Sequence, residues 1–172
     1  MIKISQSIKN KLKKIRLLLL DVDGVLTDGR IILDNRGNEL KAFHVRDGHG
    51  IKMAQQSGII VGIITGRKSA VVAIRARELG IQEVHQGARD KLSVYDSILS
   101  KYGLQDDQVA YMGDDSVDLA IFKRTGLAVT VADHDPSIKR HADLITKAEG
   151  GRGAVRELIN LLLATRSKPS SS

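Results

Sequence analysis

The sequence predicts an α/β fold with a doubly wound, mostly parallel sheet, and two observations lead to this prediction. Short runs of Val, Ile and Leu alternate with helix-length segments, the pattern of strands that are covered on both faces. Several of these runs lead directly into polar residues, as at Asp21, Thr65 and Asp114. The carboxyl ends of parallel strands share one edge of the sheet, where ligands bind. We therefore expect one site built from several strand ends.

Composition limits the kind of protein and of site. A chain of 172 residues is long enough for one domain, and 42% hydrophobic residues with 3% aromatic residues indicate an aliphatic core. The absence of cysteine excludes disulfides and thiolate metal sites, so a metal must use oxygen or imidazole ligands. The net charge of +7 fits several anionic partners. Without aromatics among the basic residues, we expect no nucleic acid as a partner. Because no apolar run approaches membrane-spanning length, we expect no membrane either.

The expected elements follow one another along the chain. Residues 1–15 form a basic N-terminal extension, either a short helix or a frayed end; residues 16–164 form the domain, and residues 165–172 a disordered tail. The apolar run after the extension is too short for a secretion signal, so we expect a cytoplasmic protein. Apolar runs predict strands at residues 17–20, 59–64, 81–85, 109–112, 127–131 and 144–145. Helical spacing predicts helices around residues 51–54, 71–79, 90–102, 119–124, 136–141 and 154–163, with Gly80 ending the second. Turn residues 34–38 between two runs predict a β-hairpin at residues 30–43.

The stretch Leu17-Leu-Leu-Leu-Asp21-Val-Asp23-Gly24 is the centre of the predicted fold. Residues i and i+2 of an extended chain point to the same side, so Asp21 and Asp23 face one pocket if the strand continues to them. Two acids at the end of a buried strand require a cation or a role in proton transfer. The alternative is a simple turn that caps a helix.

Two further strand ends and one helix start supply complementary groups. Asp21 and Asp114 are able to share one Mg²⁺, which prefers carboxylate oxygens and keeps positions for water and phosphate. Thr65 offers a hydroxyl and backbone donors where anions bind well, and Lys91 offers a positive charge. These groups would neutralise a phosphoryl group while one carboxylate attacks it and Asp23 transfers the proton.

The motifs of this chain resemble those of a known family. The motifs Asp21-Val-Asp-Gly-Val-Leu-Thr27, Thr65, Lys91 and Gly113-Asp-Asp-Ser-Val-Asp118 match, in order and spacing, those of the haloacid-dehalogenase-like (HAD) phosphatase superfamily. More narrowly, Phe43-His-Val-Arg-Asp-Gly48 and Gly150-Gly-Arg-Gly-Ala-Val-Arg-Glu157 are similar to the capless 3-deoxy-D-manno-octulosonate 8-phosphate phosphatases of lipopolysaccharide inner-core biosynthesis. The likeness covers roughly residues 15–164 and implies a HAD-like Rossmannoid sheet without a cap domain.

The resemblance also implies roles for individual residues. It makes Asp21 the nucleophile that forms an aspartyl-phosphate, and Asp23 the general acid and base. It assigns Mg²⁺ to Asp21, the main-chain carbonyl of Asp23, and Asp114. The expected phosphate-binding residues are Thr65, Gly66 and Lys91, and the expected supporting residues are Asp115 and Asp118.

Substrate-binding candidates lie near these motifs. Arg67 follows the phosphate-binding threonine, and similar phosphatases of nonulosonate 9-phosphates carry an acid at that position. Arg46, Asp47 and Gly48 are candidates through their motif, although turn residues explain them as well. His49 is assigned no chemistry, and Arg152 is either a residue at a helix entry or one that reaches a neighbouring site.

No gap between the motif residues is long enough for a lid domain beyond the hairpin. Phosphoryl transfer through an acyl-phosphate gains from exclusion of water, so we expect a neighbouring subunit to close the site with the hairpin at residues 30–43. The resemblance implies a homotetramer, and a dimer stays open.

Three alternative functions differ from this interpretation. A receiver-type signalling domain also combines acids, Mg²⁺, threonine and lysine. Its acid pair follows the first strand and its phospho-acceptor is a single aspartate on a later strand, whereas here Asp21-Val-Asp23-Gly comes first and the doublet Asp114/Asp115 comes late. Asp23 would also have no role in a receiver. A non-catalytic oligomerisation module of the same fold would not need Asp21, Asp23 and Lys91, which are all present. The third alternative, that the chain is a phosphatase of a related nonulosonate 9-phosphate, stays open.

Overall fold

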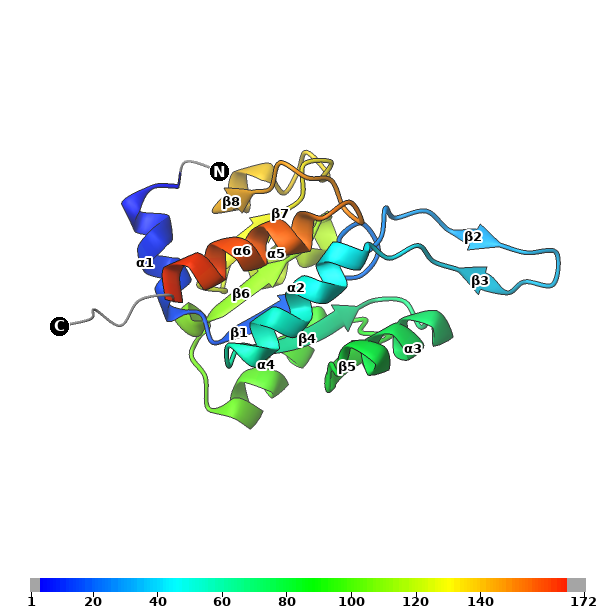
Figure 1. Cartoon of the computed structure of the whole chain (residues 1–172), viewed down its shortest axis with the longest axis horizontal. Helices are drawn as coiled ribbons and strands as arrows, with labels where there is room; N and C mark the ends of the chain where they lie inside the picture. Colours follow the sequence, from blue (N-terminus) through cyan, green and yellow to red (C-terminus); the bar gives the residue numbers. More distant parts are fainter. Residues whose placement is uncertain (1–3, 167–172) are drawn as a thin grey trace.

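A six-stranded parallel sheet forms the centre of this computed structural model, which describes residues 4–166 (Figure 1). The strand order is β5-β4-β1-β6-β7-β8, so the chain builds first to one side of β1 and then to the other. This is the arrangement of a doubly wound fold, and the predicted fold class is confirmed. The strands are β1 Leu17–Leu20, β4 Ile60–Thr65, β5 Glu83–Gln86, β6 Val109–Met112, β7 Leu127–Thr130 and β8 Leu144–Ile145.

Helices cover both faces of the sheet, which explains why β1 is an unbroken run of leucines. Leu18 and Leu20 pack on one side with residues of α1, α2, α3 and α6, whereas Leu17 and Leu19 pack on the other with residues of α4 and α5. Because side chains alternate along a strand, a strand covered on both faces needs apolar residues at every position. The helices are α1 Gln6–Lys14, α2 Val45–Gln56, α3 Ala70–Leu79, α4 Lys91–Tyr102, α5 Leu119–Phe122 and α6 Ala154–Arg166.

Capping residues set the starts and ends of the helices beside the future site. Asp90 accepts hydrogen bonds from the backbone N–H groups of Leu92 and Ser93, at 3.1 and 3.2 Å, and so begins α4 with Lys91 in its first turn. Gly80 ends α3 with φ of +71°, in the left-handed region that glycine adopts easily, as predicted. The sequence therefore fixes Lys91 at the strand edge through the cap that precedes it.

The predicted hairpin is present and extends away from the sheet (Figure 1). Its strands, β2 Ile32–Leu33 and β3 Glu39–Leu40, pair antiparallel. Asp34 stabilises the turn by accepting hydrogen bonds from the N–H groups of Arg36 and Asn38, both at 2.8 Å. The arm exposes large apolar side chains, at Ile31, Leu33 and Leu40.

Some predicted boundaries differ from the structure. The helix expected at residues 136–141 is only a 3₁₀ turn, Lys139–His141, preceded by a turn in which Asp135 accepts a hydrogen bond from the Ser137 N–H. The helix expected at residues 119–124 ends at Phe122. Two further 3₁₀ turns, Asp106–Gln108 and Ser116–Asp118, precede β6 and α5.

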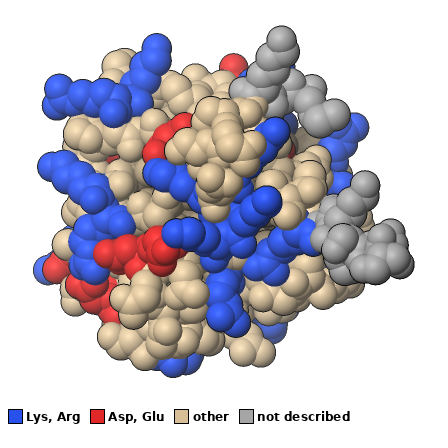
Figure 2. Space-filling view, turned by 90° about the vertical axis from the view of Figure 1, so that its left-hand side faces the viewer, with Lys and Arg blue, Asp and Glu red and all other residues tan. Residues whose placement is uncertain are grey.

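The basic N-terminal segment forms α1, the helical alternative of the prediction. Leu12 of α1 is buried in the core, while the lysines of α1 face outward on a surface rich in Lys and Arg (Figure 2). Lys11 and Lys14 form ion pairs there with Asp143 and Asp107. Charged side chains exposed to water fit a solvated face.

At the other end of the chain, α6 includes Thr165 and Arg166, which the predicted disordered tail had contained. Arg166 holds this end in place by donating hydrogen bonds to the backbone carbonyls of Ser57 and Ile15. The rest of the predicted tail, residues 167–172, lies outside the described residues. Among residues 4–166 no helix is long and apolar enough to cross a membrane. The proposed domain boundaries stay predictions.

Candidate active site

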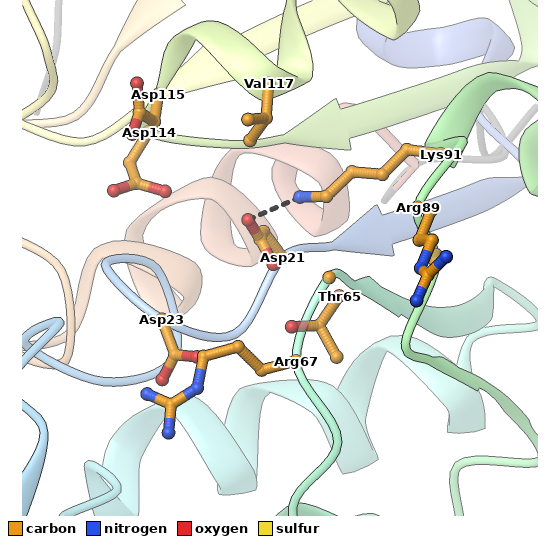
Figure 3. A pocket seen from close by; sticks show the side chains of 11 residues that line it. Asp21, Asp23, Thr65, Arg67, Arg89, Lys91, Asp114, Asp115 and Val117 are labelled. Carbon is orange, nitrogen blue, oxygen red and sulfur yellow. Dashed lines mark hydrogen bonds and ion pairs between the residues drawn. The ribbon is translucent and has the colours of Figure 1, made fainter.

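A pocket of about 470 Å³ lies at the carboxyl ends of β1, β4 and β6, where the sequence predicts a site (Figure 3). The predicted residues that line it come from these strand ends and from the start of α4. Three further residues, Ala88, Arg89 and Val117, complete the lining. The predicted residues brought together are Asp21, Asp23, Thr65, Gly66, Arg67, Lys91, Asp114 and Asp115.

Asp21 and Lys91 form the buried centre of the pocket. Asp21 Oδ1 accepts a hydrogen bond from the Val22 N–H at 2.7 Å, and Asp21 Oδ2 accepts one from Lys91 Nζ at 2.6 Å (Figure 3). Burial raises the pKa of Asp21, and the charge of Lys91 opposes that rise. For Lys91 burial acts in the opposite direction, but the charges of Asp21 and Asp118 raise its pKa overall. The pair is therefore held as carboxylate and ammonium.

Asp118, which is fully buried and does not line the pocket, holds Lys91 in place. Its Oδ1 accepts hydrogen bonds from Lys91 Nζ at 2.7 Å and from the Tyr111 hydroxyl at 2.6 Å. Its Oδ2 accepts from the N–H groups of Asp114 and Asp115, at 3.1 and 3.3 Å. With so many donors on both oxygens, Asp118 fixes the positions of Lys91 and of the loop after β6.

Asp114 differs from Asp118 because no described residue donates a hydrogen bond to its carboxylate. Burial and the nearby charge of Asp21 raise the pKa of Asp114 to about 7. Gly24 permits its close approach to the turn after β1: a Cβ at that glycine, which has φ of +87°, would lie 2.0 Å from Asp114 Oδ2. An unpartnered, half-buried carboxylate of this kind needs a cation or a proton.

The donor set of the pocket fits a hard divalent cation. Carboxylate oxygens of Asp21, Asp114 and Asp118 lie within 4.8 Å of one another. Each Asp118 oxygen already accepts two hydrogen bonds, whereas each Asp21 oxygen accepts one and Asp114 accepts none from the described residues, so Asp21 and Asp114 are the carboxylates with room for an ion. The main-chain carbonyl of Asp23, in the turn after β1, accepts no hydrogen bond from residues 4–166. Two carboxylates and one carbonyl, with space for water, suit Mg²⁺.

Thr65 and Arg67 occupy the opposite wall. Thr65 ends β4 and is 3% exposed, and its hydroxyl points into the pocket (Figure 3). Gly66 follows and is exposed. Arg67 Nη2 donates a hydrogen bond to Glu39 Oε1 of the hairpin at 2.8 Å, so the hairpin holds the guanidinium group of Arg67 in place at the pocket.

Asp23 lies at the pocket mouth beside the same arm. Its Oδ1 pairs with Lys41, which follows β3. Lys41 Nζ lies 3.3 Å from Glu39 Oε1, the oxygen that Arg67 also contacts. The hairpin therefore reaches the site through its base, within the same chain.

Three predicted substrate-binding residues are not brought to the pocket. Asp47 is buried and accepts hydrogen bonds from the N–H groups of Gly153 and Arg156, at 3.2 and 2.7 Å, so it caps the start of α6. Gly48 is packed against Arg75, whose Nη2 would lie 2.3 Å from an added Cβ. Arg46 is exposed on α2 and, like Asp47 and Gly48, is not among the lining residues.

The glycine-rich loop before α6 also has a packing role. A Cβ at Gly150 would lie 1.9 Å from the carbonyl oxygen of Gly24, and the Gly151 N–H donates to the Val25 carbonyl at 2.9 Å. The loop thus lies directly against the turn that follows β1. Arg152, like His49, is exposed and outside the pocket lining.

Sequence reasoning missed several contacts at the site. Tyr111 is an apolar-looking strand residue whose hydroxyl reaches Asp118, and Lys41 lies in a hairpin whose base returns to the site. Tyr111 lies within the buried run Val109–Met112, and nothing in that run indicates that its hydroxyl reaches Asp118. For Lys41, the polar residues at the end of an otherwise exposed strand were the available signal.

Comparisons with known proteins agree with this geometry. A family model for haloacid dehalogenase-like hydrolases matches residues 70–158. The 3-deoxy-D-manno-octulosonate 8-phosphate phosphatase KdsC of Escherichia coli is 48% identical over 165 residues, which cover 96% of this chain and 88% of that protein.

Two solved structures are also similar throughout. The crystal structure of the 3-deoxy-D-manno-octulosonate 8-phosphate phosphatase from Yersinia pestis has a TM-score of 0.94 at 45% identity and covers 96% of this chain and 89% of that one. The enzyme of that name from Moraxella catarrhalis, in complex with magnesium ion, phosphate ion and KDO, has a TM-score of 0.92 at 43% identity, with 94% and 93% covered. These findings confirm the resemblance inferred from the motifs. The chain belongs to the haloacid dehalogenase-like hydrolase family and, within it, to the group of the 3-deoxy-D-manno-octulosonate 8-phosphate phosphatases.

Proposed function

We propose that this chain is a Mg²⁺-dependent phosphatase that hydrolyses 3-deoxy-D-manno-octulosonate 8-phosphate to the free sugar acid and phosphate, a step of lipopolysaccharide inner-core biosynthesis. The observation that carries the proposal is the convergence of Asp21, Lys91 and Asp114 with Thr65 in one pocket. The similarity to phosphatases of that name over 96% of the chain supports the choice of substrate.

Asp21 is the nucleophile in this proposal. Its Oδ2 is held by Lys91, and its Oδ1 by the Val22 N–H, so the carboxylate is fixed at the base of the pocket. One oxygen attacks phosphorus, the bond from phosphorus to the sugar oxygen breaks, and an aspartyl-phosphate forms on Asp21. Lys91 and Thr65 stabilise the charge on the phosphoryl oxygens.

Asp23 moves the proton in both halves of the reaction. Protonated Asp23 gives its proton to the departing sugar oxygen, and the resulting carboxylate then takes a proton from the water that attacks the aspartyl-phosphate. Phosphate leaves with the water oxygen, and both acids return to their starting forms. Asp23 lines the same pocket as Asp21 and lies beside Arg67 (Figure 3), which is our candidate for contact with the sugar.

Asp21, Asp114 and the main-chain carbonyl of Asp23 would hold the Mg²⁺. The ion supplies positive charge that neutralises the phosphoryl oxygens and balances the buried carboxylates. The unpartnered Asp114 carboxylate supports this assignment, because burial and Asp21 raise its pKa to about 7 in the absence of a cation.

Arg67 is our candidate for contact with the sugar acid. It lies at the pocket mouth, 42% exposed, and its guanidinium is already paired with a carboxylate, that of Glu39. A guanidinium binds a substrate carboxylate in the same way. Asp115, which lines the pocket and caps the 3₁₀ turn Ser116–Asp118, is assigned a supporting role.

A phosphate-release assay tests the proposal directly. The substrates are 3-deoxy-D-manno-octulosonate 8-phosphate, a nonulosonate 9-phosphate and a simple hexose phosphate, each with Mg²⁺ and with a chelator. We expect the highest kcat/KM for the first substrate, no turnover with chelator, and no turnover by Asp21→Asn. Preference for the nonulosonate 9-phosphate would assign the chain to that activity, and turnover by Asp21→Asn would remove Asp21 as nucleophile.

We also propose a homotetramer in which the hairpin arm of one subunit covers the site of its neighbour. The exposed apolar side chains of the arm support this, with Ile31 63% and Leu33 58% exposed. Light scattering of the purified protein should give the mass of four chains, and a fully active monomer would refute the idea. The cytoplasmic location stays a prediction, which cell fractionation tests.

A further inference from the structure

The base of the hairpin brings a connected set of charged groups to the pocket mouth. Lys41 contacts both Asp23 and Glu39, and Glu39 in turn accepts hydrogen bonds from Arg67 and from the Ser69 hydroxyl. Ser69 is the N-cap of α3 and accepts a hydrogen bond from the Val72 N–H at 3.3 Å. The set therefore connects Asp23 to a helix of the main body.

Lys41 is buried in a way that requires its two acids. Its side chain is 1% exposed, although it stands at the foot of an arm whose other side chains are largely in water. A buried ammonium is strongly unfavourable unless it is paired and hydrogen-bonded. Asp23 and Glu39 supply that pairing, so the position of Lys41 is tied to theirs.

The contact with Lys41 uses only one of the two carboxylate oxygens of Asp23. Lys41 holds Oδ1, whereas Oδ2 accepts no hydrogen bond from any described residue, and the Asp23 side chain is 23% exposed at the pocket. Asp23 stands in an irregular turn, outside any helix or strand. A carboxylate on such a turn samples several rotamers unless a partner selects one.

We propose that Lys41 is a positioning residue for the general acid: it holds one oxygen of Asp23 so that the other faces the leaving oxygen of the substrate. Glu39 keeps Lys41 in place and connects it to Arg67 and Ser69. The inference rests on the proposed function, because it assumes that Asp23 donates the proton. It adds a residue of the hairpin base, in the same chain, to the proton-transfer apparatus.

Leaving-group dependence separates this role from a merely structural one. A sugar phosphate releases a basic alkoxide that needs a proton, whereas p-nitrophenyl phosphate releases a phenolate that leaves without one. The ratio kcat/KM covers the steps up to departure of the leaving group, so it reports the acid and not the later attack by water. The test compares kcat/KM for the two substrates in Lys41→Met, Lys41→Arg and Asp23→Asn.

We expect Lys41→Met to lower kcat/KM for the sugar phosphate by at least about tenfold, within the range of 10²–10⁴ that general acid catalysis supplies. Its kcat/KM for p-nitrophenyl phosphate should change less than about threefold, since that step does not use the acid. Lys41→Arg should recover part of the loss. Lys123→Met is the matched control: it removes the same charge from an exposed position, and both ratios should equal those of the wild type.

The outcomes distinguish the two proposals. Suppose that Asp23→Asn loses kcat/KM selectively on the sugar phosphate. If Lys41→Met then loses kcat/KM equally on both substrates, or on neither, the role of Lys41 alone is overturned. Absence of selectivity in Asp23→Asn itself overturns the acid role in the proposed function. Circular dichroism confirms the fold of each variant. If Lys41→Met does not fold, Lys41→Gln, which keeps a hydrogen-bond donor without the charge, is measured in the same pair of assays and must show the same selective loss.

Discussion

The ion pairs of Lys91 lead to a quantitative prediction about stability. Lys91 Nζ lies 2.6 Å from Asp21 Oδ2 and 2.7 Å from Asp118 Oδ1, and the side chains of Lys91, Asp21 and Asp118 are 6%, 9% and 0% exposed. Lys91→Met keeps the length of the side chain and removes its charge. Two buried carboxylates then lose the cation that they share.

Removing one partner of a buried ion pair destabilises a protein by about 3–5 kcal/mol, because the remaining charge is left uncompensated. Since two acids are affected, we expect Lys91→Met to lower the free energy of unfolding by about 4–5 kcal/mol in metal-free buffer. Urea denaturation followed by circular dichroism measures the loss by linear extrapolation. The variant should also lose phosphatase activity.

A second substitution shows whether uncompensated charge is the cause. Asp21→Asn in the Lys91→Met background removes one of the two charges and keeps an acceptor for the Val22 N–H, while the oxygen that becomes an NH2 is the one that Lys91 no longer contacts. We expect it to recover about half of the lost free energy. Lys123→Met, at an exposed position, should stay within about 0.5 kcal/mol of the wild type. A loss below about 1 kcal/mol for Lys91→Met, or no recovery in the double variant, would refute the reasoning.

Three further predictions concern other parts of the structure. Gly24→Ala should reduce kcat/KM for phosphate release at least about tenfold, because its Cβ would lie 2.0 Å from Asp114 Oδ2, whereas Gly58→Ala, at a similar φ of +81° but with no atom within 4 Å, should keep full activity; equal activities would contradict this. Asp47→Ala should lower stability by about 1–3 kcal/mol, since two N–H groups at the start of α6 lose their acceptor, with KM unchanged; a raised KM at unchanged stability would instead return Asp47 to the substrate site. Glu83, whose pKa falls from its ordinary value of 4.5 to about 2 because hydrogen bonds, led by that from Lys101, outweigh burial, contributes stability that is fully present above about pH 5 and lost as the pH falls towards 2. The difference in unfolding free energy between wild type and Glu83→Gln should therefore shrink over that range, and a constant difference would exclude this contribution.

The main features of the site could be predicted from sequence because parallel strands end at a common edge. Asp21, Thr65 and Asp114 each follow a buried apolar run, and the Asp90 cap puts Lys91 at a helix start. These placements need only the strand pattern. The coverage of both faces follows from the same pattern, whereas the order of the strands is known only from the structure.

The groups that sequence reasoning misplaced depend on contacts between distant segments. Asp47 belongs to a motif that suggested contact with substrate, yet its carboxylate caps α6, more than a hundred residues further along the chain. Lys41 reaches Asp23 only because the hairpin folds back on its own base. The contact of Asp47 has no periodic signature, and the polar residues at the end of the hairpin strand draw attention to Lys41 without identifying Asp23 as its partner.

Trapping the phosphorylated enzyme tests the central claim most directly. Asp23→Asn, which should lack the base for the second step, is mixed with Mg²⁺ and p-nitrophenyl phosphate, whose leaving group needs no acid in the first step. The mixture is quenched in acid within milliseconds to seconds, digested and analysed by mass spectrometry. We predict a hydroxylamine-sensitive phosphoryl group on the peptide that contains Asp21, and none in Asp21→Asn. Turnover by the wild type with no phosphoryl group on that peptide at any time, or with the group on another residue, would contradict the account.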